Sequence, residues 1–130
     1  DFEGEPQRTL AERRAKHSAL RDVAGMLRSF DYARHAALHQ SAATGADFER
    51  LAISARKWER SMREGFLQTY GQVAVDGGLY ADAAEFEATK SLIDLFELEK
   101  AFYELRYEMD NRPDWIGVPL EGIAALAGVS

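Results

Sequence analysis

Polar side chains suited to binding a polyhydroxylated ligand gather in one stretch of this sequence, residues 96–119. Most of them recur at steps of three or four residues, as side chains on one side of a helix do. Carboxylates, amides and cationic groups hydrogen-bond to hydroxyls, and aromatic rings pack against the apolar face of a pyranose. These residue types predict a sugar site, for which the candidates are Glu97, Lys100, Tyr103, Glu104, Tyr107, Asn111, Arg112 and Trp115.

The same spacing has a simpler interpretation. Glu97 and Lys100 are three residues apart, and Lys100 and Glu104 are four apart. Opposite charges at these spacings stabilise a solvent-exposed helix without any ligand. An ordinary solvated helix face is therefore the alternative to a sugar site.

Carboxylates also cluster at the start of the chain, where Asp1, Glu3 and Glu5 alternate. Alternate residues of an extended segment share a face. Carboxylate oxygens are the preferred ligands of hard cations such as Mg²⁺. The segment therefore predicts a magnesium site at Asp1 and Glu3, with an ordinary acidic loop as the alternative.

Two parts of the chain, one near each end, resemble one family. Residues 97–115 read Glu-Leu-Glu-Lys-Ala-x-Tyr-Glu-x-x-Tyr-Glu-x-x-Asn-Arg-Pro-Asp-Trp, and Val-Pro-Leu follows at 118–120. This run resembles the C-terminal signature of bacterial maltokinases, which occur alone or fused behind trehalose synthase. Residues 1–6 and 21–33, the latter Arg-Asp-Val-Ala-Gly-Met-Leu-Arg-Ser-Phe-Asp-Tyr-Ala, resemble the same family. The resemblance covers both ends of the chain, and the middle only as a helical pattern.

The resemblance implies transfer of the ATP γ-phosphoryl group to the anomeric hydroxyl of maltose, which gives maltose 1-phosphate for α-glucan synthesis. It implies that Asp1, with Glu3 as a weaker candidate, binds the Mg²⁺ that bridges the nucleotide phosphates. It also implies that Asp22 braces the catalytic loop and that the polar stretch binds maltose. From its position alone, Asp22 is expected to favour the positive end of a helix dipole, and the two roles are compatible.

The catalytic base and the nucleotide-binding lysine of such kinases lie upstream of the segment that Asp1 matches. The chain also begins with Asp. We therefore expect a fragment that is inactive alone and whose partners are the rest of the kinase and a fused or separate trehalose synthase. The alternatives are a non-catalytic helical tail of a trehalose synthase, or a helical module that binds a sugar or a partner.

The composition bears on the kinds of partner and location that this chain could have. A net charge of −6 gives no support for a nucleic-acid partner. No apolar run approaches membrane-spanning length, and the absence of cysteine suits a cytoplasmic location. At 130 residues the chain is long enough for one core.

Helical periodicity dominates the chain, with helices expected at 18–40, about 47–75, 82–90, 91–112 and 120–126. Residues 10–16 could form a further short helix. Asp47 is expected to cap the helix over about 47–75. Two apolar stripes are expected to be buried: Leu92, Leu95, Leu98, Phe102, Leu105 and Met109; and Phe48, Leu51, Ala55, Trp58, Met62, Phe66, Tyr70 and Val73. The prediction is a single mostly α domain over 1–130. Its antiparallel helices would form most of the C-terminal lobe of a kinase-like fold, with a strand and metal-loop segment at 1–17 and a helical bundle at 18–130.

Overall fold

The protein is helical throughout the part that its structure, a computed structural model, describes: the backbone of residues 6–128 and the side chains from residue 10. The elements are α1 (Pro6–Gln40), α2 (Gly45–Asp76), α3 (Ala83–Glu87), α4 (Lys90–Asn111), a 3₁₀ turn η1 (Pro113–Trp115) and α5 (Gly117–Leu126). No strand occurs in that part, which confirms the mostly α prediction. The strand expected at the start of the chain falls on residues outside it.

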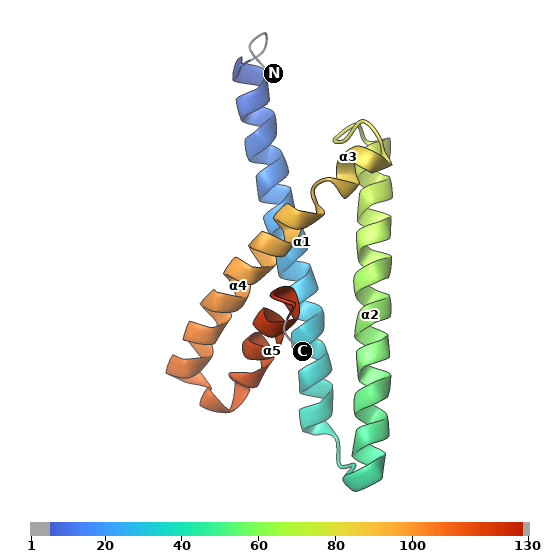
Figure 1. The fold of residues 1–130 in the computed structure, drawn as a ribbon, viewed down its shortest axis with the longest axis vertical. Helices are drawn as coiled ribbons and strands as arrows, with labels where there is room; N and C mark the ends of the chain where they lie inside the picture. Colours follow the sequence, from blue (N-terminus) through green and yellow to red (C-terminus); the bar gives the residue numbers. More distant parts are fainter. Residues whose placement is uncertain (1–5, 129–130) are drawn as a thin grey trace.

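Helix α1 is the centre of the arrangement (Figure 1). Helix α2 returns antiparallel along one side of α1, and α4 and α5 pack on the other side. The short helix α3 connects the end of α2 to α4. The apolar core lies where α3 and the start of α4 meet α1 and α2, and it consists of Leu20, Val23, Ala24, Leu27, Ala74, Tyr80, Phe86, Ile93 and Phe96.

Two helix starts differ from the sequence prediction. Helix α1 begins at Pro6 rather than Ser18, so residues 6–17 are helical and not a loop. Asp22 therefore lies in the middle of α1, and its predicted place at the positive end of the helix dipole is wrong. Proline suits a first helical turn, because its missing N–H has no intrahelical partner there. The residue before α2 is Thr44, and Asp47 instead lies in the first turn, where its carboxylate pairs with Arg50 and favours the positive end of the helix dipole.

Helix α5 also begins earlier than predicted, at Gly117 rather than Leu120, whereas three other helix ends carry local signals in the sequence. Asp82 caps α3, accepting a hydrogen bond from the backbone N–H of Glu85 at 2.9 Å. Gly78 follows α2 with a φ of +84°, a conformation that glycine adopts without steric cost. Pro113 ends α4, as the restriction on residues before proline requires.

The burial predicted for the apolar stripe of α4 is wrong for half of its residues. Leu92 packs against the core, and Leu98 and Leu105 are partly buried. Leu95, Phe102 and Met109 are 57%, 53% and 61% exposed. The side of α4 that packs inward instead carries Ile93, Phe96, Glu97, Ala101, Glu104 and Glu108. The carboxylates are tolerated there because each has a partner: arginines of α1 and α2 pair with Glu104 and Glu97, and Arg112 and Tyr32 bind Glu108, as described below.

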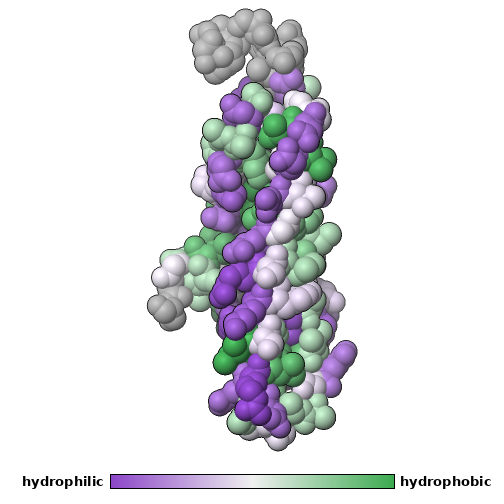
Figure 2. Space-filling model, turned by 90° about the vertical axis from the view of Figure 1, so that its right-hand side faces the viewer, coloured by the Kyte–Doolittle hydropathy of each residue, from purple (hydrophilic) through white to green (hydrophobic). Residues whose placement is uncertain are grey.

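The stripe predicted for α2 is likewise largely outside. Phe48, Leu51, Trp58, Met62 and Val73 are exposed, whereas Phe66 and Tyr70 pack against the core. Seen from the side of α2, the surface carries a hydrophilic band along its length with hydrophobic side chains beside it (Figure 2). Among the described helices, none combines the length and apolarity needed to cross a membrane.

Candidate functional site

A buried ion network connects α1, α2, α4 and α5. We use this name for the arginines Arg28, Arg34 and Arg63 together with the carboxylates Asp31, Glu59, Glu97, Glu104 and Glu121. All but Arg63 and Glu121 are buried residues. Buried charges are tolerated only when paired, so these contacts determine which polar residues remain free for a ligand.

Arg28 of α1 connects α1 to α4. Its Nε donates to Glu104 Oε1 at 3.0 Å, and its Nη1 donates to Asp31 one turn further along α1. Gly122 of α5 covers the guanidinium, since a Cβ on this glycine would lie 2.3 Å from Nη1. Glu104 was predicted to bind sugar. It is only 9% exposed, and its carboxylate pairs with Arg28.

Arg63 of α2 holds α4 by a bidentate ion pair. Its Nη2 and Nη1 donate to the two oxygens of Glu97 at 2.8 and 2.9 Å. Glu97 is only 1% exposed. Both carboxylate oxygens of this predicted sugar ligand are thus used by the fold.

Arg34 of α1 connects the buried ion network to α2 and α5. Its Nε donates to Glu59 at 2.5 Å and its Nη2 to Glu121 at 2.9 Å. Burial, followed by the hydrogen bond to Asp31 and the charge of Asp31, raises the pKa of Glu59 to about 7. Burial also acts to raise the pKa of Asp31, but the hydrogen bond with Glu59 and the charge of Arg28 outweigh it and lower that pKa. The two pKa shifts are opposite, so Glu59 is the carboxyl group of this pair that takes up a proton first as the pH falls.

The predicted ligands at the end of α4 make local contacts. Arg112 binds Glu108 through two hydrogen bonds of 2.8 and 2.7 Å, and these lower the pKa of Glu108. Tyr32 donates to the same carboxylate at 2.7 Å. The Asn111 amide donates to the carbonyl of Tyr107 at 2.9 Å, within its own helix. These bonds shape the turn into α5.

The ring of Trp115 is also in contact with other side chains. Its ring stacks on His39 with 4.8 Å between centroids, and the Arg112 guanidinium lies 4.5 Å from the ring centre. Tyr32 stacks nearby at 6.2 Å. Trp115 is therefore a half-buried ring whose π surface is already in contact with these neighbours.

One open groove does bring predicted residues together. Asp22 of α1 and Lys100 and Tyr103 of α4 line a groove of about 500 Å³, to which Arg21, Phe96 and Glu99 also contribute. We call it the α1–α4 groove. Tyr103 is 66% exposed, so its ring is available to a ligand. Tyr107, Asn111, Arg112 and Trp115 are not among its lining residues.

Charges in the α1–α4 groove balance. Arg21 and Lys100 face Asp22 and Glu99, and Arg21 and Glu99 lie 2.5 Å apart as an exposed ion pair. The Arg21 guanidinium also lies 4.2 Å from the centre of the Phe96 ring. Dense donors and acceptors without net charge, beside an exposed aromatic ring, suit a neutral hydroxylated ligand better than a phosphate.

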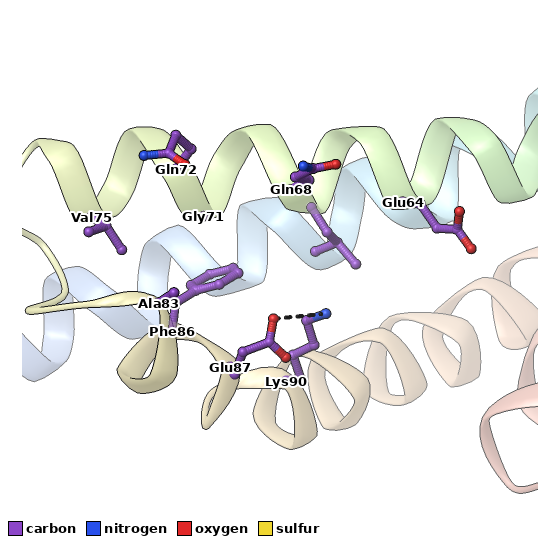
Figure 3. Close-up of a pocket in the computed structure, with 10 residues that line it drawn as sticks. Glu64, Gln68, Gly71, Gln72, Val75, Ala83, Phe86, Glu87 and Lys90 are labelled. Carbon is purple, nitrogen blue, oxygen red and sulfur yellow. Dashed lines mark ion pairs between the residues drawn. The ribbon is translucent and has the colours of Figure 1, made fainter.

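A second hollow lies between α2, α3 and the start of α4 (Figure 3). It has a volume of about 310 Å³ and is lined by Glu64, Leu67, Gln68, Gly71, Gln72, Val75, Ala83, Phe86, Glu87 and Lys90. Gly71 shapes it, because a Cβ there would lie 2.8 Å from the Phe86 ring. Lys90 pairs with Glu87 at 3.5 Å, so its charge is already matched.

The predicted magnesium ligands Asp1 and Glu3 lie outside the described residues. Within the described part, no group of three or more histidine or acidic side chains is placed to hold a metal ion. The fit of a metal to this chain therefore depends on residues outside that part.

The residues that sequence reasoning missed are those of the buried ion network on α1 and α2. Arg28, Asp31 and Arg34 continue the three- and four-residue spacing of the apolar positions 20, 23, 24 and 27, and that continuity is the signal that could have identified them. No protein-family model matches this chain, and no solved structure gives a significant match to it.

Proposed function

We propose that this chain is the helical C-terminal part of a maltokinase and that its α1–α4 groove contributes to the maltose site. The observation that carries the proposal is the meeting of Asp22, Lys100 and Tyr103 at one groove. These residues come from the two segments that resemble maltokinases, 21–33 and 97–115. Segments far apart in the chain thus contribute to one polar surface.

The composition of the groove supports a sugar ligand. Balanced charges provide hydrogen-bond donors and acceptors without attracting a competing anion. The exposed Tyr103 ring offers a flat surface to the C–H face of a pyranose. Glu97 and Glu104 are not part of the proposed maltose site, because their carboxylate oxygens pair with Arg63 and Arg28.

In the intact kinase, ATP and Mg²⁺ would be held by other residues, among them Asp1 and Glu3. Phosphoryl transfer requires the nucleotide, the metal and a base to be positioned together. The sequence contains no glycine-rich phosphate loop. We therefore expect that the chain alone does not phosphorylate maltose.

Maltose binding measured by calorimetry on this chain tests the proposal. Tyr103→Ala is expected to weaken binding roughly tenfold, because it removes the exposed ring that lines the groove. Tyr107→Ala is the matched control, since it removes an exposed tyrosine of the same helix that does not line the groove. Absence of binding at about 10 mM maltose, or equal loss in both variants, would contradict the assignment of the groove.

A second assay tests the reaction. Phosphorus NMR of a longer protein that contains this chain, incubated with ATP, Mg²⁺ and maltose, should show maltose 1-phosphate. The same assay on the 130-residue chain should show none. Product formation by the chain alone would show that our account of the missing catalytic parts is wrong.

A further inference from the structure

The outward face of α4 carries an apolar stripe with a regular spacing. Leu95, Leu98, Phe102, Leu105 and Met109 follow alternating steps of three and four residues. This is the a/d pattern by which two helices pack side by side. Leu95, Phe102 and Met109 are exposed, and the inward side of the helix is occupied by the carboxylates of the ion network. Leu98 and Leu105 are partly buried, so Leu95, Phe102 and Met109 make up the exposed part of the stripe.

We propose that this stripe pairs with the same stripe of a second copy of the chain, with the two α4 helices antiparallel. Charges beside the stripe select this occupant. Glu99 and Arg106 both flank it on one edge, one at each end. Two-fold antiparallel pairing places Glu99 of each copy beside Arg106 of the other, so the contact is self-complementary.

The register follows from the same charges. With Phe102 against Leu105 of the second copy, Leu98 meets Met109 and the two Glu99–Arg106 pairs form. A shift by one heptad would instead bring the two Glu99 side chains together. Parallel pairing would place Glu99 beside Asp94, which is also repulsive.

Arg106 is available for this contact. It is exposed, and no ion-pair partner of Arg106 occurs among the described side chains. Glu99 is already paired with Arg21, but its side chain is 60% exposed, and a carboxylate can accept from two cations. An exposed pair of this kind costs little to rearrange.

The contact is short. Two heptads bury less than the ~800 Å² per partner of a standard stable interface. We therefore expect association in about the high-micromolar range, measured by sedimentation velocity at increasing protein concentration. The proposed pairing shares Glu99 with the α1–α4 groove, but Phe102 does not line that groove. Phe102→Ser therefore tests the pairing without altering the proposed sugar site.

The apolar seam is tested with Phe102→Ser and its matched control Tyr107→Ser. Both replace an exposed aromatic residue of α4, but Tyr107 lies about 140° around the helix from Phe102. Phe102→Ser should weaken dimerisation by roughly tenfold or more, while Tyr107→Ser leaves it unchanged. Circular dichroism should show both variants folded, because both positions are exposed.

The orientation is tested by charge reversal. Glu99→Lys and Arg106→Glu each place like charges at both contacts and should be less associated than the wild type. An equimolar mixture of the two variants should recover association. In the mixed dimer the introduced lysine of one copy meets the introduced glutamate of the other, and the unchanged Arg106 and Glu99 meet at the second contact. A wild type that stays monomeric to about 1 mM, a dimer indifferent to Phe102→Ser, or a mixture no better than its components would each overturn the proposal.

Discussion

Substituting Glu59 by glutamine should remove a specific part of the pH dependence of folding. Glu59 lies in the interior of the α1–α2 pair, with Arg34 on one side and Asp31 close by. Burial raises its pKa from 4.5 to about 7, with the hydrogen bond to Asp31 and the Asp31 charge adding to the shift. The folded state therefore prefers the protonated form of Glu59.

The sign and size follow from proton linkage. A carboxyl group whose pKa is higher in the folded state stabilises the fold fully below pH 4.5, and this contribution is lost as the pH rises to about 7. Moving the pKa from 4.5 to about 7 corresponds to roughly 3 kcal/mol of unfolding free energy. Glutamine does not titrate, so Glu59→Gln should gain stability relative to the wild type by up to that amount across this range.

Urea denaturation of both proteins at several pH values between 4.5 and 8 measures the difference in unfolding free energy. The control is Glu121→Gln, since Arg34 lowers the pKa of Glu121 against the opposing effect of burial. Its contribution is present above the unfolded pKa and is lost only on further acidification. Parallel curves for the wild type and Glu59→Gln between pH 5 and 8 would refute the raised pKa of Glu59.

Two further predictions concern the packing of the network. Gly122→Ala should destabilise the fold by about 1–3 kcal/mol, because its Cβ would meet the Arg28 guanidinium, whereas Gly117→Ala has open space and should be near neutral in thermal unfolding. Glu97→Ala should cost about 3–5 kcal/mol in urea denaturation, since it leaves Arg63 partly buried without its partner. Adding Arg63→Ala to Glu97→Ala should recover part of the lost stability. If the losses of unfolding free energy in the two single variants simply add in the double variant, Glu97 and Arg63 are not coupled.

The sequence was sufficient to predict the helices and most of their ends. The Asp82 cap, the glycines after α2 and the break at Pro113 are local signals that depend on a few neighbouring residues. The start of α1 was missed because the charged residues after Pro6 carry no apolar stripe, although they can extend a helix already begun at its core.

The inward face of α4 was assigned incorrectly, for a physical reason. Periodicity shows which residues share a face but not which face packs inward. The apolar stripe was assigned to the interior because burial of hydrocarbon is the usual driving force. Glu97 and Glu104 became interior residues only because Arg63 and Arg28, on two other helices, meet them. That information is not contained in the α4 sequence alone.

The two faces of α4 differ in the residues they carry and in what those residues contact. Glu97 and Glu104 are seven residues apart, about 10.5 Å along the helix, and each matches a guanidinium held by a different helix. If α4 moved along its axis by one helical turn, both carboxylates would lose their arginine partners. A purely apolar face would lose less free energy of folding on such a shift. The charges therefore fix the position of α4 against α1 and α2. Leu95, Phe102 and Met109 are left exposed on the other side, so the α1–α4 groove and the outer stripe belong to a helix whose position these charges set.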